Sequence, residues 1–287
     1  MQTLWMDLID AQHRHAGKRY KTRVIEGGSG PAVIMMHGTG GHAEAFARNF
    51  PGMCKDYHLY SIDSLWHGQS ERPEFTGKTL EAWVDQVIDL MDAEGIDQAH
   101  LEGESMGGWI ALYVALAHPD RVKSLVLNTT GGVKLPAELL DTGALDKLRE
   151  SSIAVLDNPT MDLIRTRLEW VMAAPERVTD ELASVRLHYY LDPEVNAALR
   201  KVYATQLNPV FRDKYELSEE QLKGIKCPVL VLWTEKNPHR GPDAGRAIAD
   251  LIPNAEFYCI QDAAHWPQWE KPEEHDRVVR AFFEKCP

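Results

Sequence analysis

The stretch LEGESMGGWIALYVALAHP, residues 101–119, decides the fold of this chain. An apolar, strand-like run ends in a G-x-S-x-G pattern formed by Gly103, Ser105 and Gly107, and an apolar, helix-like run follows it. On such a strained strand-to-helix turn, side chains two residues before and after the serine would collide with neighbouring backbone. The helix amino terminus also offers amides and a positive dipole end to a developing oxyanion. The pattern therefore predicts that Ser105 is a nucleophile.

A glycine-rich loop upstream supports this interpretation. The segment VIMMHGTGGHAEAF, residues 33–46, reads as a strand that runs into an HG-containing loop. Loops of this kind donate one N–H to the oxyanion, and the residue after the nucleophile donates the other. We therefore expect the amides of Thr39 and Met106 to form an oxyanion hole. Gly38 and Gly40 are expected to contact the substrate.

A second upstream loop fits the same arrangement. The segment YSIDSLWHGQSERP, residues 60–73, contains a D-x-x-x-x-G-x-S turn directly after another predicted strand. Trp66 stands at a position in this turn where glycine is often found.

A histidine near the carboxyl end completes the catalytic pair. In IQDAAHWPQWEKPEEHDRVVRAFF, residues 260–283, His265 follows the last predicted strand and precedes the last predicted helix. In this chemistry a histidine takes the serine proton during attack and returns it to the leaving group. The chain order of serine, acid and histidine predicts that His265 is the base for Ser105.

The rest of the chain alternates between short strand-like runs and longer helix-like runs, which predicts a mostly parallel sheet with helices on both faces. The six predicted strands are residues 32–38, 58–64, 99–105, 123–130, 227–234 and 255–262. From about residue 133 to 220 the alternation fails, and amphipathic helical patterns punctuated by prolines replace it. We predict an α/β fold with an inserted helical lid, divided into 1–132, 133–220 and 221–287.

Composition excludes several classes of partner. The formal net charge of −12, without a basic stripe, disfavours nucleic acid. The amino-terminal sequence lacks a signal-peptide pattern and no apolar run is long enough to span a bilayer, so we expect a cytoplasmic protein. The four cysteines have no metal-ligand or disulfide spacing. We expect a small-molecule substrate, no metal and no organic cofactor.

Over nearly its whole length the chain resembles the α/β-hydrolase superfamily, and more narrowly the meta-cleavage product hydrolases, which break carbon–carbon bonds in bacterial aromatic catabolism. The narrower resemblance rests on HWPQWEKPEEHDRVV, residues 265–279, and on VTDELASVR, residues 178–186. In that family an arginine at the position of Arg186 binds the carboxylate end of the substrate. Trp266 would pack on the conjugated substrate, or serve core packing alone. The resemblance also allows a homo-oligomer.

The resemblance implies a specific reaction. A 2-hydroxy-6-oxohexa-2,4-dienoate would bind with its carboxylate at Arg186 and become ketonised, so that the carbon about to leave can carry negative charge. Ser105 would then attack the distal carbonyl, releasing 2-hydroxypenta-2,4-dienoate. Water would hydrolyse the acyl-enzyme to a carboxylic acid. The chain departs from the family pattern at Glu104, where asparagine is usual, and in its shorter oxyanion loop.

The acid of the triad is missing from its usual place. After the run PVLVLW the family carries aspartate where this chain has Asn237. Asparagine accepts a hydrogen bond from the imidazole but adds no charge, and the loss for a serine enzyme is on the order of 10⁴ in kcat. Three explanations compete: Asn237 serves by itself, the sequence carries an inactivating change, or another carboxylate substitutes. We favour Asn237 at the position, with Glu235 as the leading substitute carboxylate, ahead of Asp243 and Asp262.

Two other functions stay open at this stage. A carboxylesterase or lactonase would need the Ser105 and His265 pair but not Arg186. A catalytically weak binding protein of the same fold would keep the pocket without the triad, and Asn237 is the only residue that favours it.

Overall fold

The computed structural model describes residues 3–286, and its centre is a sheet of eight strands. The strand order is β1-β2-β4-β3-β5-β6-β7-β8, with β1 and β2 antiparallel to their neighbours and the others parallel. The strands are β1 (Gln12–Ala16), β2 (Thr22–Gly28), β3 (Ala32–Met36), β4 (His58–Ile62), β5 (Ala99–Glu104), β6 (Val122–Asn128), β7 (Val229–Thr234) and β8 (Ala255–Ile260). All six predicted strands are confirmed.

Strands β1 and β2 were not predicted from the sequence. Strand β1 reads QHRHA and lies at the sheet edge with mostly exposed side chains, so it has no apolar alternation to detect. Strand β2 is largely buried, and it connects β1 to β4.

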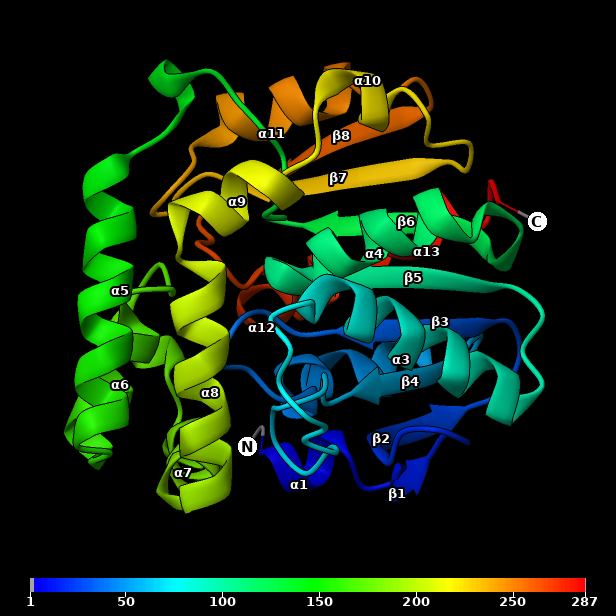
Figure 1. Ribbon diagram of the computed structural model, residues 1–287. Coiled ribbons are helices and arrows are strands. Elements are labelled where there is room, and N and C mark those ends of the chain that lie inside the picture. The colour runs from blue at the N-terminus through cyan, green and yellow to red at the C-terminus, as the bar shows by residue number, and fades with distance from the viewer. Residues whose placement is uncertain (1–2, 287) are drawn as a thin grey trace.

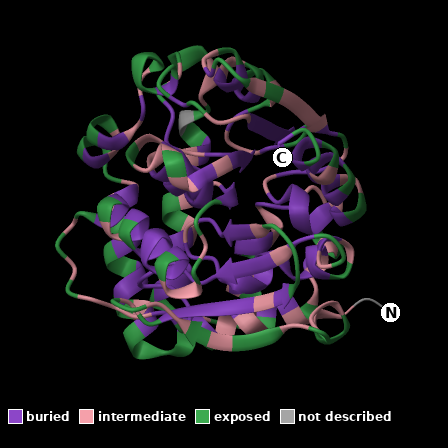
Figure 2. Cartoon of the chain, turned by 90° about the vertical axis from the view of Figure 1, so that its right-hand side faces the viewer, coloured by how far each residue is buried: buried purple, intermediate pink, exposed green. Residues whose placement is uncertain are grey.

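Helices cover both faces of the sheet, as predicted (Figure 1). Successive strand residues point to opposite faces: Ile34 and Met36 pack on one side, and Met35 on the other. On the first side lie α3 (Thr79–Glu94), α4 (Met106–Ala117) and α11 (Pro242–Asp250); on the second lie η1 (Ala43–Asn49), α2 (Phe50–Met53) and α13 (Pro272–Phe283). Figure 2 shows the strands inside this shell as buried.

A helical segment lies between β6 and β7. Its elements are η3 (Ala137–Leu139), α5 (Thr142–Asp157), α6 (Met161–Glu169), η4 (Pro175–Arg177), α7 (Asp180–Leu191), α8 (Pro193–Gln206), α9 (Pro209–Tyr215) and α10 (Glu219–Leu222). Its helices α5 to α8 stand at the left of Figure 1, at one end of the strands, and α9 and α10 lie near the top. Polar residues cap α5 to α9: Asp141, Thr160, Thr179, Asp192 and Asn208 each accept a backbone N–H. The division of the chain at 133 and 220 stays a prediction.

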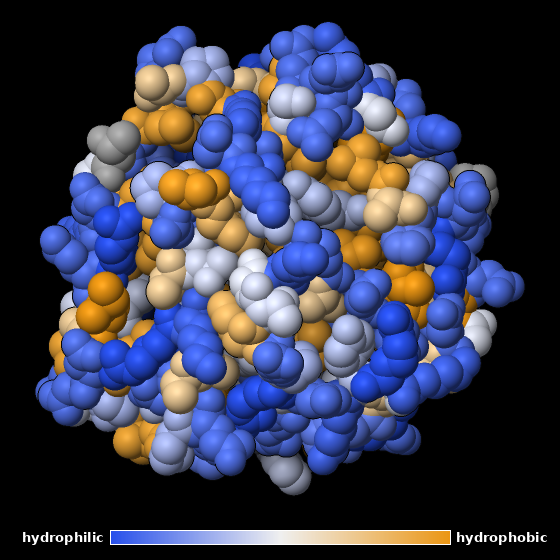
Figure 3. Space-filling view, in the orientation of Figure 1, coloured by the Kyte–Doolittle hydropathy of each residue, from blue (hydrophilic) through white to orange (hydrophobic). Residues whose placement is uncertain are grey.

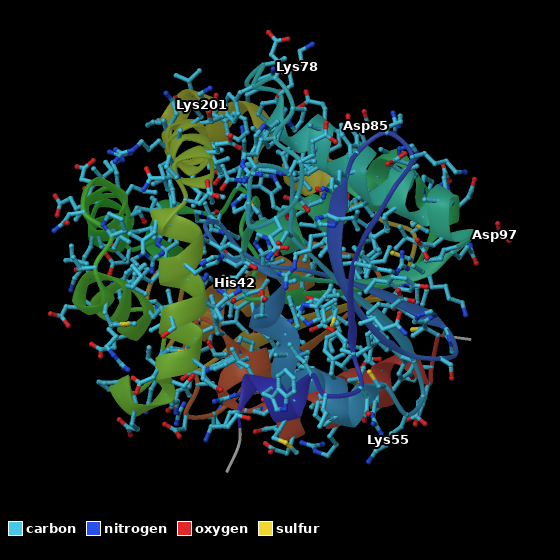
Figure 4. All side chains as sticks on the ribbon, turned by 90° about the horizontal axis from the view of Figure 1, so that it is seen from below. His42, Lys55, Lys78, Asp85, Asp97 and Lys201 are labelled. Atoms are coloured by element: carbon cyan, nitrogen blue, oxygen red, sulfur yellow. The ribbon has the colours of Figure 1, made fainter. Side chains whose placement is uncertain are left out.

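A buried contact joins this segment to the core. The ring of His42 lies 5.4 Å from that of Tyr189 on α7, and its Nδ1 is 3.0 Å from Glu44 Oε2. Figure 4, seen from below, places His42 near the middle of the molecule, between the helical segment and the sheet. The other labelled side chains lie at the periphery: Lys55, Lys78, Asp85, Asp97 and Lys201.

The outer surface contains both hydrophobic and hydrophilic residues. On the face shown in Figure 3, hydrophobic residues form small patches separated by hydrophilic ones. Within residues 3–286 no helix combines the length and the apolar character that a membrane span requires.

Two positive φ angles bear on the loop predictions. Trp66 has φ 66°, which explains why glycine often stands at this position, and its indole Nε1 is held by Pro73 O at 2.9 Å. Gly95 ends α3 with φ 68°, a left-handed conformation that glycine often adopts at the end of a helix. Thr79 is the first residue of this helix, and Lys78 takes the cap position without a side-chain hydrogen bond.

The glycines around Ser105 are required by close backbone packing. A Cβ on Gly103 would lie 2.1 Å from the Gly107 carbonyl carbon, and one on Gly107 would lie 2.0 Å from Met36 O. Helix α4 can therefore pack against β5 and β3 only if both positions lack side chains. The strain predicted for this turn is present, since Ser105 has φ 55° and ψ −109°.

We predict that Gly107→Ala lowers the free energy of unfolding by about 3 kcal/mol, because backbone atoms on two elements must move to admit the methyl group. Gly241→Ala is the matched control: a Cβ there meets nothing within 4 Å, and the expected change is below about 1 kcal/mol. Guanidinium chloride unfolding of both variants measures the difference. Equal stabilities would contradict the packing argument.

Candidate active site

The residues predicted to be catalytic meet at one cavity. Ser105, His265 and Asn237 all line it, from the β5–α4 turn, the loop after β8 and the loop after β7. The cavity is bounded on its other side by the helical segment, which contributes Arg167 of α6 and Arg186 of α7. The three loops lie at the carboxyl ends of the parallel strands β5, β7 and β8, which is where ligands bind in open α/β sheets.

Asn237 does occupy the acid position. Its Oδ1 lies 2.8 Å from His265 Nδ1, and its Nδ2 donates to Arg240 O at 2.9 Å. Because a carbonyl only accepts, the second contact fixes the amide orientation and points Oδ1 at the imidazole. His265 Nδ1 therefore carries a hydrogen. Asn237 thus contacts the ring where the sequence places it, but its amide supplies no charge.

Glu235 does not substitute for the missing acid, so that expectation is wrong. Its side chain is exposed, and its Oε2 accepts the backbone N–H of Asp262 at 2.9 Å. Asp262 is engaged by Arg177, Lys236 and Lys271, whose hydrogen bonds hold its pKa well below the usual range. The remaining alternative, Asp243, is exposed in the first turn of α11.

The carboxylate that does contact the imidazole belongs to Glu104. Its Oε1 lies 3.1 Å from His265 Nε2, and its Oε2 accepts the Gly38 N–H at 2.6 Å. Only 1% of Glu104 is exposed. Gly38 is needed for this contact, since a Cβ there would lie 2.3 Å from Oε2. The sequence shows Glu104 only as a departure from the family pattern, because its distance from His265 along the chain hides the contact.

The position of Glu104 bears on the catalytic base. Its Oε1 would form an ion pair with His265 Nε2 if the imidazole were protonated, since the two atoms are 3.1 Å apart. The described residues give Ser105 Oγ no hydrogen bond. The nitrogen that would accept the serine proton therefore lies next to Glu104 in this structure.

The predicted oxyanion donors are free to bind a ligand. Thr39 and Met106 line the cavity, and within residues 3–286 neither amide N–H has a hydrogen-bond acceptor. Thr39 is fixed instead through its hydroxyl, which donates to Gln206 Oε1 on α8 at 2.5 Å. Gly38 lines the cavity as predicted.

Gly40 lies behind the cavity instead of lining it. A Cβ there would lie 2.1 Å from the hydroxyl of Tyr203 and 2.4 Å from that of Tyr190, both on the helical segment. Its N–H donates to His67 Nε2 at 3.1 Å. This glycine permits close packing of the loop, and its position outside the cavity lining gives no support to the predicted substrate contact.

Two neutral histidines hold the oxyanion loop. His37 Nδ1 bonds Gly38 O at 2.7 Å, while its Nε2 accepts the Ser64 N–H. Burial, helped by the neighbouring His67, holds the pKa of His37 well below its usual value. Burial likewise lowers the pKa of His67 to about 4. Each ring can therefore accept from one backbone amide and donate to one carbonyl, which fixes two loops against each other.

Arg186 lies in the cavity without a counter-ion. It is 3% exposed, and its Nε and Nη2 find no hydrogen-bond partner in the described residues. Its guanidinium carbon lies 5.2 Å from the ring centroid of Trp266, which also lines the cavity. Both residues are thus placed where the sequence predicts them.

A second arginine was missed by the sequence reasoning. Arg167 is 7% exposed and lines the same cavity, and among the described residues its one side-chain hydrogen bond is to Ser152 Oγ at 3.3 Å. Burial lowers its pKa, and the charge of Arg186 adds to this effect. No motif marks Arg167, because it looks like any charged residue of an amphipathic helix. Two buried guanidinium groups therefore face one end of the cavity.

Comparisons with known proteins agree with this geometry. Residues 31–272 match the family described as the alpha/beta hydrolase fold. The chain is 28% identical over 266 residues to 2-hydroxymuconate semialdehyde hydrolase of Pseudomonas sp. strain CF600, covering 92% of this chain and 90% of that protein. It is 29% identical over 264 residues to 2-hydroxy-6-oxononadienedioate/2-hydroxy-6-oxononatrienedioate hydrolase of Burkholderia vietnamiensis, covering 88% and 87%.

A solved structure is similar over almost the whole chain. The 2-hydroxy-6-oxo-6-phenylhexa-2,4-dienoate hydrolase of Rhodococcus sp. strain RHA1 superposes with a TM-score of 0.86 at 22% identity, covering 96% of this chain and 99% of that one. Together with the family match over residues 31–272, this means that the chain belongs to the alpha/beta hydrolase fold family.

Proposed function

We propose that this protein is a serine-dependent hydrolase of meta-cleavage products, which breaks the C5–C6 bond of a 2-hydroxy-6-oxohexa-2,4-dienoate. The observation that carries the proposal is the buried pair Arg167 and Arg186, to which the described residues offer no ion-pair partner, in the cavity that also contains Ser105. A buried uncompensated cation is strongly unfavourable, so the pair is best explained by an anionic substrate. The relatives named for such substrates support the same chemistry.

Two cations suit one end of this substrate in its 2-enolate form. That end carries a carboxylate and an adjacent oxyanion, and guanidinium groups bind such oxygens through paired N–H donors. An esterase or lactonase needs only the Ser105 and His265 pair, so it leaves both arginines without a role.

The proposed first step uses a shared proton, which we place between Glu104 Oε1 and His265 Nε2, 3.1 Å apart. The Glu104 and His265 pair protonates C5 of the bound enolate, which produces the 2-oxo form and leaves His265 Nε2 unprotonated beside an ionised Glu104. Ser105 then gives its proton to Nε2 as its oxygen attacks C6. The amides of Thr39 and Met106 bind the oxyanion that forms at C6.

Collapse of this intermediate breaks the C5–C6 bond. The electron pair passes to C5 and is delocalised onto the 2-oxo group, whose charge Arg167 and Arg186 stabilise. Protonation gives 2-hydroxypenta-2,4-dienoate, and water, activated by His265, hydrolyses the acyl-enzyme to a carboxylic acid. During both steps the imidazolium lies between Asn237 and Glu104, and Glu104 supplies the negative charge that Asn237 lacks.

In this proposal the helical segment from 133 to 220 serves as a lid, because it closes the cavity opposite Ser105. The cytoplasmic location and the homo-oligomer inferred from the sequence stay predictions.

We predict that the protein bleaches the visible absorbance of a 2-hydroxy-6-oxohexa-2,4-dienoate, and that Ser105→Ala slows the bleaching by about 10³-fold or more, since the covalent route is lost. A p-nitrophenyl ester is measured in parallel. Ester hydrolysis without bleaching would move the assignment to an esterase or lactonase. Bleaching by Ser105→Ala at the wild-type rate would exclude the serine mechanism.

The role of Glu104 gives a second prediction. Glu104→Gln keeps the size of the side chain but removes the charge and the shared proton, so kcat should fall on the order of 10²- to 10⁴-fold and its pH profile should change shape. Glu235→Gln, at the exposed site, is the matched control and should retain the wild-type kcat. A Glu104→Gln enzyme with unaltered kcat and pH profile would refute a catalytic carboxylate at this position.

A third prediction concerns Asn237→Asp. The new carboxylate would face Arg240 O, where Nδ2 now donates at 2.9 Å, so unfolding should become easier by about 1–3 kcal/mol. Because Glu104 already provides the negative charge, kcat should rise by less than about tenfold. Denaturant unfolding and the bleaching assay test both points. A rise of about 10³-fold would identify the aspartate as the missing triad member.

A further inference from the structure

A buried carboxylate outside the cavity holds the chain just before the catalytic base. Glu270 is the last residue of the short helix α12 (Pro267–Glu270), which lies between the helical segment and the sheet in Figure 1. Its backbone N–H donates to Trp266 O at 2.9 Å, so one turn of helix brings its side chain back toward His265. Glu270 Oε1 accepts the Ala264 N–H at 2.6 Å. The residue before His265 is therefore fixed by this carboxylate, whose side chain is 0% exposed.

The second oxygen of the same carboxylate binds the helical segment. Glu270 Oε2 accepts the Ala173 N–H at 2.7 Å, from the loop between α6 and η4, and Arg177 Nη1 at 2.8 Å, from η4. Arg177 Nη1 also donates to Asp262 O, in the loop that carries His265. The guanidinium group compensates the buried charge of Glu270. Through one side chain, the helical segment is thus hydrogen-bonded to the loop of the catalytic base.

The backbone of His265 itself is held from two further sides. Its N–H donates to Val171 O at 2.9 Å, again in the helical segment, and its carbonyl accepts Thr129 Oγ1 at 2.7 Å, from the loop after β6. Thr129 has φ 42°, which a β-branched residue rarely adopts. Both polar backbone groups of His265 therefore have partners from other parts of the chain.

These contacts are needed because His265 lies on a loop, and loops are ordinarily the mobile parts of a fold. Its imidazole must present Nδ1 to Asn237 Oδ1, 2.8 Å away, and keep Nε2 available for the serine proton. A displacement of about 1 Å in such a group costs on the order of 10²-fold in rate. The accuracy of the base thus depends on what fixes its backbone.

The chemistry of the contact requires a carboxylate at this position. Three donors converge on two oxygens: the Ala264 N–H on Oε1, and the Ala173 N–H with Arg177 Nη1 on Oε2. A glutamine has the same shape but only one acceptor oxygen, and its NH2 group would face a donor in either orientation. An amide would therefore release either the chain before His265 or the helical segment.

We propose that Glu270 is a positioning residue for His265, and that it makes the position of the base depend on the docking of the helical segment. Glu270 does not line the cavity formed by the described residues, so it acts through Ala264 and not on the substrate. This inference rests on the proposed function only in taking His265 as the base for Ser105. It requires no particular substrate.

The test measures how fast Ser105 is phosphonylated by a small alkyl phosphonofluoridate, followed by the mass of the intact protein. The serine oxygen displaces fluoride from phosphorus and gives its proton to His265, so the rate reports the catalytic pair without a dienoate. Glu270→Gln should lower the rate constant on the order of 10- to 10²-fold, with every molecule labelled in the end. Glu273→Gln, at an exposed position of α13, is the matched control and should keep the wild-type rate constant.

The fraction labelled separates positioning from stability. A purely structural role for Glu270 would reduce the fraction of molecules that can be labelled and leave the rate constant of the remainder at the wild-type value. That result would overturn the proposal, as would wild-type values of both quantities.

A second variant tests the link to the helical segment and keeps Glu270 in place. Arg177→Lys retains the positive charge, but a single ammonium group cannot reproduce the guanidinium contacts with both Glu270 and Asp262. Its rate constant should fall by about 3- to 10-fold. The double variant Glu270→Gln/Arg177→Lys should react no more slowly than Glu270→Gln, because both changes break one link. Wild-type reactivity of Arg177→Lys, or additive losses, would overturn the dependence on the helical segment.

The bleaching assay, run on the same proteins, separates this inference from the proposed function. Slower phosphonylation of Glu270→Gln in a protein whose wild type bleaches no dienoate would support the positioning role and overturn the carbon–carbon hydrolase. Equal phosphonylation rates of Glu270→Gln and wild type would overturn the positioning role, even if both proteins bleach the dienoate.

Discussion

The close approach of α4 to β5 and β3 is the constraint on which the rest of the structure depends. Gly103 and Gly107 admit no side chain there, and this packing forces Ser105 into φ 55° at the start of a helix. The same turn also positions two other groups of the site. It presents the Met106 amide, and it places the residue before the serine, Glu104, against the Gly38 amide and His265. A fold that positions a nucleophile in this way also positions its neighbour, and here that neighbour is charged.

The sequence predicted the parts of the molecule that leave a local pattern. Six strands, the glycine turn and His265 were recognisable because apolar runs and glycines are imposed by neighbours along the chain. Strand β1 was missed because an exposed edge strand needs no apolar alternation. The substitute carboxylate was misplaced at Glu235, two residues from Asn237, because nearness along the chain was taken for nearness in space. Glu104 reaches His265 from a different strand, and no single segment of the sequence records that contact.

The distribution of charge gives the cavity its character. The protein is acidic overall, yet this cavity contains the buried pair Arg167 and Arg186, without ion-pair partners in the described residues, and one buried carboxylate, Glu104. Folding around such an excess of positive charge is unfavourable in the empty state, and binding of an anion removes part of that penalty. The empty site therefore has a raised free energy, and a bound anion lowers it. This arrangement is expected where binding energy is to be used in the reaction.

The contact between Gly40 and the two tyrosines has a consequence for how such enzymes diversify. Tyr190 donates to Gly40 O, and Tyr203 to Thr39 O, each at 3.3 Å, so the helical segment supplies partners for the backbone of the loop that is expected to bind the oxyanion. A helical segment taken from another hydrolase would have to supply two hydroxyl donors for the same two carbonyls, Thr39 O and Gly40 O. Substrate range and catalytic competence are therefore inherited together in this chain, as one unit that recombination cannot easily separate.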